Sequence, residues 1–413
     1  MRITDLEAFT VAIPFRAPLI SAFGISYPAR VRTFIRVHTD AGITGIGETG
    51  PSATAPFSRN ALLARFEKTV KPAIVGESPF DSEWLRRKLY FTSDAVAVEI
   101  ACWDIKAQAA GVPLYRLLDG QGKVDRVPVA GYCFFRAPAL DGTGAVTPDT
   151  YVEHCQSIQR AGGFSVLKLK LGAQHPAVEV KLVKAVREAV GREIELRIDP
   201  NGSWSLATAL RAVKRLEPVD LQYIEEPIRA AGPADGTTQT ASLKRLRAAS
   251  RTPIAADHCY RLDQLTQIIR DDAADLALAD VFGCGGIGRT ARYVRTAAAF
   301  GLGVAMHSGT ELGVGQIAKV HLQAALQDEI AYAGDAIYPE YVDDVLMGGK
   351  LQVIDGHFAV PQTPGLGITL DEERLARWEL TSERHAELDA FWRNRQALIG
   401  TDYPTEDMLM RHY

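Results

Sequence analysis

Eight short apolar stretches, most of them followed by a stretch of helical periodicity, occupy the chain between residues 127 and 335. Strands that alternate with amphipathic helices form a parallel sheet, because each helix returns the chain to the same edge. Eight parallel strands are the number that closes a β/α barrel. The predicted strands are VPVAGYCFF (127–135), SVLKLK (165–170), EIELRID (193–199), LQYIEE (221–226), PIAAD (253–257), DLALAD (275–280), LGVAMH (302–307) and EIAYAGD (329–335).

The flanking regions follow other patterns. Residues 1–122 combine β-prone segments at 2–13, 31–39 and 43–49 with helical patterns, which predicts an α+β domain. The barrel domain is predicted over 123–362. Residues 363–413 begin with the Pro/Gly-rich TPGLGI and continue as a polar helical tail, which we expect to return to the first domain.

Composition limits the class of protein. Net charge is −4 over 413 residues and no Lys/Arg cluster stands out, so the sequence predicts no nucleic-acid partner. No apolar run reaches membrane-spanning length and no signal-peptide core follows Met1, which predicts a cytoplasmic protein without membrane contact. The cysteines are odd in number and lack C-x-x-C spacing, as expected of reduced thiols. They are Cys102, Cys133, Cys155, Cys259 and Cys284.

A polar residue stands at the carboxyl end of nearly every predicted strand. In a β/α barrel these ends surround one mouth, the face at which barrel enzymes place their chemistry. Acids also cap the helices that follow strands, so any single acid has a structural explanation. A whole ring of such polar residues favours a functional site. The residues are Lys170, Asp199, Glu225, Asp257, Asp280, His307 and Asp335.

Three adjacent strands end in Asp199, Glu225 and Asp257. Three converging carboxylates repel each other unless a cation compensates them. Mg²⁺ prefers oxygen ligands of this kind, so the sequence predicts a Mg²⁺ site here, with Mn²⁺ as the other suitable ion.

Two lysines, Lys168 and Lys170, share one face of the second predicted strand, since residues i and i+2 of a strand point the same way. A solvated basic face would explain an isolated K-x-K. Beside the carboxylates, we expect both lysines to point inward, with Lys168 and the cation lowering the pKa of Lys170 so that Lys170 acts as a base. Across the ring, Asp280 and His307 end neighbouring strands and predict a dyad in which the carboxylate orients the imidazole.

Two further motifs are ambiguous. Residues 283–288 fit G-x-G-x-x-G, but no acid follows at the spacing of a dinucleotide site. We interpret them as the loop and helix start after the sixth strand, close to a substrate anion. His258 follows Asp257 and is predicted to be a metal ligand, a neighbour of one, or a hydrogen-bonded rim residue.

These motifs, in this order and spacing, resemble the mandelate racemase and glucarate dehydratase branches of the enolase superfamily. The likeness covers nearly the whole chain. GYCFF (131–135) and TPGLGI are most similar to the glucarate dehydratases, although the apolar loop LISAFGISY (19–27) and Ala336-Ile337 replace polar positions of that group. The motifs are KLK (168–170), DPNGSW (199–204), IEEP (224–227), AADH (255–258), LAD (278–280), MHS (306–308) and, before the barrel, WDIKAQAAGVPLYRLLDG (103–120).

The resemblance implies a capping α+β domain over a modified (β/α)₇β barrel, with Mg²⁺ on Asp199, Glu225 and Asp257. It also implies abstraction of the proton α to a carboxylate, with the metal stabilising the enediolate. The family's cycloisomerases and dipeptide epimerases carry a lysine where this chain has Asp280, which disfavours cycloisomerisation.

We therefore expect a dehydratase of an acid sugar, in which Lys170 removes the α-proton and His307 protonates the departing β-hydroxyl. A racemase or epimerase using the same two bases and a non-catalytic metal-dependent binding protein are the alternatives. The expected partners are a small-molecule carboxylate and further copies of the chain in a homo-oligomer. The residues predicted to contact the substrate are Lys168, Asn201, Tyr132, Ser308 and Asp335.

Overall fold

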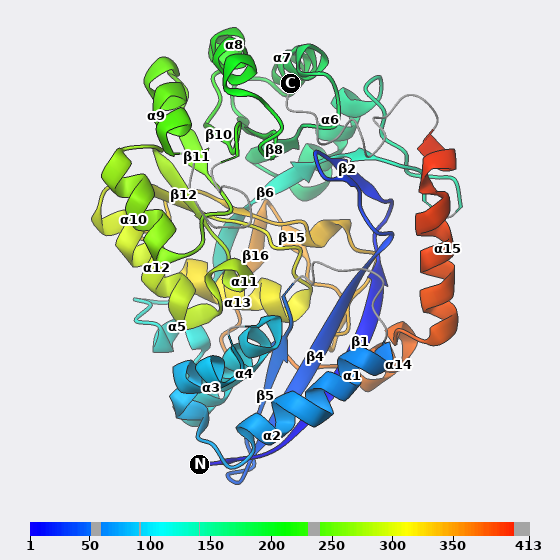
Figure 1. Cartoon of the computed structure of the whole chain (residues 1–413), viewed down its shortest axis with the longest axis vertical. Coiled ribbons are helices and arrows are strands. Elements are labelled where there is room, and N and C mark those ends of the chain that lie inside the picture. Colours follow the sequence, from blue (N-terminus) through cyan, green and yellow to red (C-terminus); the bar gives the residue numbers. More distant parts are fainter. Residues whose placement is uncertain (51–58, 91, 140, 230–239, 400–413) are drawn as a thin grey trace.

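An antiparallel sheet opens the chain in this computed structural model (Figure 1). Its strands β1 (Ile3–Pro14), β4 (Ala29–Thr39) and β5 (Thr44–Glu48) lie in the order β1-β4-β5. Gly42 has a φ of +72° in the turn that joins β4 to β5, a conformation that glycine adopts without strain. The structure describes residues 1–50, 59–90, 92–139, 141–229 and 240–399.

The helix α4 (Ser93–Ala109) packs directly on β5. A Cβ at Gly47 would lie 2.0 Å from the carbonyl oxygen of Ala97, so the absence of a side chain allows this close approach. The remaining elements of the N-terminal domain are β2 (Leu19–Ser21), β3 (Gly24–Ile25), α1 (Arg59–Arg65), a π-helical stretch (Phe66–Val70), α2 (Lys71–Ile74), a 3₁₀ turn (Pro79–Asp81), α3 (Ser82–Lys88) and α5 (Leu114–Leu117).

In the described part of the chain the second sheet has ten strands, eight of which are parallel. Seven of them run in the order β13-β12-β11-β10-β9-β8-β6, and β14 pairs in parallel with β6 and lies beside β13. The sheet is therefore the predicted barrel, although the last strand is shorter than the predicted 329–335. The strands are β6 (Arg126–Cys133), β8 (Val166–Lys170), β9 (Glu195–Asp199), β10 (Tyr223–Glu225), β11 (Ile254–Ala256), β12 (Leu276–Ala279), β13 (Gly303–Met306) and β14 (Gly334–Asp335).

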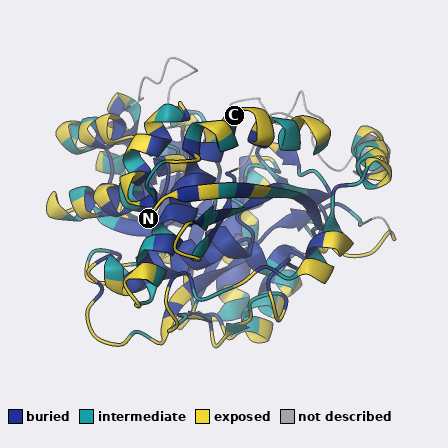
Figure 2. Ribbon diagram, turned by 90° about the horizontal axis from the view of Figure 1, so that it is seen from below, coloured by how far each residue is buried: buried dark blue, intermediate teal, exposed yellow. Residues whose placement is uncertain are grey.

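Helices follow the first seven of these strands, which gives the (β/α)₇β pattern. Figure 2 shows the strands buried at the centre and the exposed residues on the surrounding helices. The helices are α6 (Tyr151–Gly162), α7 (Pro176–Val190), α8 (Leu206–Leu216), α9 (Thr240–Ala249), α10 (Leu262–Asp271), α11 (Val281–Cys284), α12 (Ile287–Ala299) and α13 (Gly313–Ala325). Short 3₁₀ turns occupy Glu217–Val219 and Tyr338–Glu340, and the short strand β7 (Phe135–Arg136) pairs with β2.

The C-terminal part of the chain contacts both domains. Strand β16 (His357–Ala359) pairs antiparallel with β6 and with β15 (Val353–Ile354). Helix α14 (Glu372–Trp378) lies against β1. Helix α15 (Ser382–Ile399) places Leu388 in a small apolar cluster with Ala12 of β1, and the rest of the predicted segment, 400–413, lies outside the described residues.

Two buried carboxylates of the N-terminal domain cap helices of the barrel. Glu48 accepts hydrogen bonds from Leu312 N at 2.7 Å and Gly315 N at 2.8 Å, at the start of α13. Glu99 accepts from Ile287 N and Gly288 N at the start of α12. Acids at helix N-termini are stabilised by unpaired N–H groups and by the helix dipole, so these contacts hold the N-terminal domain over the barrel mouth. None of the helices in the described ranges is long and apolar enough to span a membrane.

Candidate active site

A cavity of about 320 Å³ lies where the barrel mouth meets the N-terminal domain. Lys170 and Asn201 enter it from β8 and the turn after β9, and His307 enters from the end of β13. Around the closed barrel β14 and β6 lie between β13 and β8, so Lys170 and His307 approach the cavity from different sides. Tyr132 and Ser308 also line it, as expected of substrate contacts.

Both lysines of the K-x-K motif point into the barrel, as predicted, and each is paired with acids. Lys170 Nζ donates to Asp199 Oδ2 at 2.5 Å. Lys168 Nζ, which is fully buried, donates to Glu225 Oε1 and Asp335 Oδ2, both at 2.5 Å, and lies 3.4 Å from Asp199 Oδ2. Burial alone lowers the pKa of an amine, but the charges of Asp335 and Glu225 raise the pKa of Lys168 well above its ordinary value. Lys168 is therefore a charged side chain that bridges these carboxylates.

The predicted metal ligands lie together and are fully buried. Glu225 and Asp257 can offer oxygens within 4.8 Å of each other and of a His307 nitrogen. Asp199 is not in this group, and its carboxylate accepts from Lys170 Nζ and from Asn201 N, the latter donating to Oδ1 at 2.8 Å.

The donor atoms fit a divalent cation. Glu225 Oε2 and Asp257 Oδ2 are buried and have no hydrogen-bond donor among the described residues. Burial and the charge of Asp199 raise the pKa of Glu225 well above its ordinary value, so the cluster resists full ionisation as long as no cation compensates it. Two buried carboxylate oxygens that accept no hydrogen bond are suitable ligands for Mg²⁺.

His307 is held by an acid and a phenol. Its Nδ1 lies 3.4 Å from Asp280 Oδ2 and 3.2 Å from the Tyr260 hydroxyl, and its Nε2 lies 3.5 Å from Asp257 Oδ2. The predicted Asp280–His307 dyad is present. Tyr260 also donates to Asp257 Oδ1 at 2.7 Å, so one side chain links the imidazole to the carboxylate cluster.

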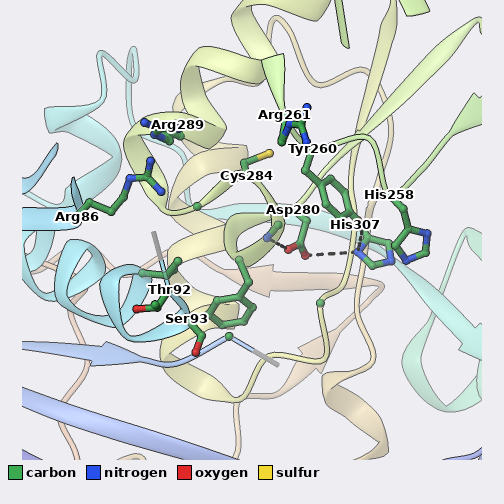
Figure 3. Close-up of a pocket in the computed structure, with 16 residues that line it drawn as sticks. Arg86, Thr92, Ser93, His258, Tyr260, Arg261, Asp280, Cys284, Arg289 and His307 are labelled. Carbon is green, nitrogen blue, oxygen red and sulfur yellow. Dashed lines mark hydrogen bonds and ion pairs between the residues drawn. The ribbon is translucent and has the colours of Figure 1, made fainter. Parts of the chain in front are cut away.

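A larger cavity of about 630 Å³ adjoins this site and shares His258, His307 and Gly309 with it. Figure 3 shows His307, Asp280 and Tyr260 on one side of it and Arg86 and Arg289 on the other. Asp280 and His307 both line this larger cavity, and the dashed line in Figure 3 marks the contact between them.

His258 is hydrogen-bonded beside the metal cluster, and with Glu226 and Asp257 it forms a second group whose possible ligand atoms lie within 4.8 Å of one another. Its Nδ1 lies 2.9 Å from Glu226 Oε2 and 3.4 Å from Asp257 Oδ2. Burial opposes protonation of the ring, but Asp257 and Glu226 raise its pKa to about 10. Both His258 and Glu226 have positive φ angles, of 55° and 37°, at the ends of β11 and β10.

Two other predicted substrate contacts have partners inside the protein. Asp335 is fully buried and accepts from Tyr132 and from Arg197, at 2.9 and 2.6 Å, in addition to Lys168. Neither Asp335 nor Lys168 is among the residues that line the cavity of about 320 Å³, so their contact with substrate stays a prediction. Ser308 lines the cavity, and its hydroxyl donates to Glu311 Oε2 at 3.1 Å.

Residues 283–288 form the loop and helix start after the sixth strand, as predicted, and their closeness to a substrate anion stays a prediction. The N–H groups of Ile287 and Gly288 at the start of α12 donate to Glu99, a carboxylate of the protein itself. This helix start is therefore occupied by Glu99. Because Glu99 lies 188 residues before Ile287 in the chain, nothing in the sequence indicated this contact.

Two residues of the site were missed from the sequence. Tyr260 follows Asp257 by three residues, and that short spacing was the available signal. Arg30, at the start of β4, lines the same cavity as Lys170, and nothing in its local sequence distinguishes it from a surface arginine.

Comparison with known proteins gives matches along most of the chain. Residues 3–119 match the model of the mandelate racemase / muconate lactonizing enzyme N-terminal domain, and residues 150–374 match that of the enolase C-terminal domain-like family. A probable glucarate dehydratase from Streptomyces coelicolor is 31% identical over 87% of this chain and 88% of its own length. An N-succinyl-L-Arg/Lys racemase from Bacillus cereus is 26% identical over 91% of this chain and 97% of its own.

Solved structures agree with these matches. An enolase from Thermobispora bispora, complexed with magnesium and formate, superposes with a TM-score of 0.82 at 28% identity, covering 95% of this chain and 98% of its own.

Proposed function

Because the chain belongs to the mandelate racemase / muconate lactonizing enzyme family of the enolase superfamily, whose members are enzymes, we propose that it is a Mg²⁺-dependent dehydratase of an acid sugar. The observation that supports this most strongly is the placement of Lys170 and His307 on different sides of one cavity beside buried carboxylates. The substrate is a small-molecule carboxylate with hydroxyls on its α- and β-carbons.

Glu225 and Asp257, with Asp199 beside them, would hold the cation at the base of the site. When bound, Mg²⁺ supplies positive charge that stabilises the negative charge left on the substrate carboxylate as the α-proton departs. Mn²⁺, which favours the same oxygen ligands, would serve as a substitute.

Lys170 takes the α-proton in its neutral form. Its Nζ stands at the cavity wall on β8, where it has Asp199 as its acid partner. Lys170 removes the proton from one face of the α-carbon, and the opposite face is directed toward β13 and His307.

His307 then gives a proton to the β-hydroxyl, which departs as water. Asp280 and Tyr260 lie on the Nδ1 side of the ring, so the other nitrogen is the one available for transfer. The resulting enol becomes a 2-keto-3-deoxy acid, and the elements of one water molecule are lost from the substrate.

A racemase is the second candidate, because the same two groups could remove and return a proton on opposite faces of the α-carbon, and a racemase is among the relatives. Asp280 stands where the family's cycloisomerases and dipeptide epimerases carry a lysine, which disfavours cycloisomerisation.

A panel of aldonates and aldarates incubated with the protein and Mg²⁺ tests the proposal. We expect formation of a 2-keto acid, detected as its semicarbazone, from at least one member. Inversion of the α-centre without keto acid would replace the proposal by the racemase, and neither product nor α-hydrogen exchange with any member would contradict both.

A further inference from the structure

Arg30 brings a positive charge to the wall of the cavity that lies opposite the barrel. It is the second residue of β4, in the N-terminal domain, whereas Lys170 and His307 come from the barrel. Its side chain is partly buried, and its guanidinium lies 5.5 Å from the centroid of the Phe15 ring, which holds it in place.

Among the charged residues that line this cavity, Arg30 alone pairs with no carboxylate in the described part of the chain. Lys170 pairs with Asp199, His258 with Glu226 and His307 with Asp280. Arg30 Nε is buried and has no hydrogen-bond acceptor. A partly desolvated guanidinium without an anion is costly, which indicates that a ligand provides the missing acceptor.

The neighbouring arginine of the same strand already has an acid partner. Arg32 follows Arg30 by two residues and therefore points to the same side of β4. Arg32 Nε lies 3.3 Å from Glu48 Oε1, and the second oxygen of Glu48 accepts from the start of α13. The two guanidiniums share one face of the strand, so an anion at Arg30 would also relieve their repulsion.

The Arg30 side chain interacts with the hydroxyl of Tyr341, a neutral group, and the loop at 19–26 adds few other polar groups. Ser21 and Ser26 accept from backbone N–H groups of their own loop, those of Phe23 and Leu19. Apart from these hydroxyls, the loop presents mainly apolar side chains to the cavity. They are Leu19, Phe23 and Ile25, together with Phe134 and Ile337 from the barrel domain.

We infer that the substrate carries a second carboxylate, at the end remote from the metal cluster, and that Arg30 binds it. This inference rests on the proposed function. The planar guanidinium matches a carboxylate with two parallel hydrogen bonds. One arginine balances the single charge of a carboxylate, whereas a phosphate would leave a charge uncompensated.

The arginines of the adjoining larger cavity do not offer the same site. Arg86 and Arg289 both bond to Glu83, and Arg261 bonds to Asp263. A substrate carboxylate there would compete with an acid already in place, and such competition is absent at Arg30.

Matched pairs of ligands test the inference. Galactarate and galactonate, and likewise glucarate and gluconate, differ only in a carboxylate against a CH₂OH at the remote end. We expect the full chain with saturating Mg²⁺ to bind one diacid about 10- to 100-fold more tightly than its partner, measured as dissociation constants by calorimetry. Arg30→Gln should bring this ratio close to one, and Arg30→Lys should retain part of it.

Arg36→Gln is the matched control, because Arg36 is a half-buried arginine of the same strand that pairs with Glu7 and Glu372 away from this cavity. It should keep the wild-type ratio. Equal dissociation constants for both members of each pair overturn the inference, and so does the absence of measurable binding of either member. An equal loss of affinity for the diacid and its monoacid partner in Arg30→Gln also overturns it. Failure of the proposed dehydration is a separate outcome, seen as diacid binding without 2-keto acid.

Discussion

At the scale of single residues, Lys168 shows how burial changes the meaning of a charge. From sequence it is a second cation that lowers the pKa of its neighbour. In the structure its ammonium is enclosed by Asp335, Glu225 and Asp199, and it offsets their mutual repulsion. Its first role is therefore to hold the acidic cluster together in the folded chain.

Replacing Lys168 by methionine should destabilise the protein by about 3 to 5 kcal/mol, because it leaves buried carboxylates without their partner. Lys170→Met is the matched control, since Lys170 has one acid partner and a side chain that is 10% exposed, and it should cost less. Urea unfolding of both variants measures the difference. Equal free energies of unfolding would contradict this role of Lys168.

The metal cluster makes a separate prediction about Asp257. Its Oδ2 is buried without a hydrogen-bond donor, so Asp257→Asn should weaken Mg²⁺ binding at least about ten-fold, measured by calorimetry on the free protein. Asp263→Asn removes an exposed acid of the following helix and should leave the affinity unchanged. The ligand assignment would be wrong if both variants bound Mg²⁺ as the wild type does.

Whether a site residue could be predicted from the sequence depends on its position in the fold. Strand ends are recognisable because apolar runs stop at them, and Lys170, Asp199, Glu225 and Asp257 therefore carried a signal. Arg30 carried none, because the other residues that line its cavity come from distant parts of the chain.

At the scale of elements, strand position was easier to predict than strand length. Each of the eight predicted segments overlaps a strand of the barrel, but β14 is reduced to Gly334–Asp335. In the N-terminal domain, α1 and α2 are separated by a π-helical stretch at Phe66–Val70. Local periodicity predicts that an element exists, whereas its ends depend on pairing and capping partners that are remote in sequence.

The contact of α4 with β5 depends on glycine, so Gly47→Ala should destabilise the protein by about 3 kcal/mol through a clash with the backbone of α4. Gly42→Ala, in the open turn where no heavy atom lies within 4 Å, should cost only about 1 kcal/mol of backbone strain. Thermal and urea unfolding of the two variants test this order. A smaller loss for Gly47→Ala than for Gly42→Ala would contradict the packing described here.

At the scale of the whole molecule, buried polar contacts join the two domains and the C-terminal segment. His321 of α13 accepts from Tyr115 N of the N-terminal domain at 3.3 Å, and its other ring nitrogen bonds to Leu366 O of the C-terminal segment at 3.1 Å. Burial lowers the pKa of His321 to about 4. The neutral ring is thus the form that links three parts of the chain.

This link predicts a pH dependence of stability. The unfolded chain binds a proton at His321 below pH 6.5, whereas the folded chain binds it only near pH 4, so stability falls as the pH is lowered through that interval. Between pH 7 and 4.5 the wild type should lose about 2 to 3 kcal/mol more than His321→Gln loses. Equal losses of unfolding free energy in the wild type and in His321→Gln, measured by urea unfolding at both pH values, would contradict this role of His321.

The division of labour between Lys170 and His307 is the central claim, and exchange of the substrate α-hydrogen with deuterated solvent tests it most directly. Followed by NMR on a substrate from the acid-sugar panel, His307→Asn should lose dehydration yet retain exchange, because Lys170 and the metal cluster remain. Lys170→Ala should lose both, since no base stands on that face. Normal exchange in Lys170→Ala together with none in His307→Asn would contradict the claim and place the α-proton toward β13.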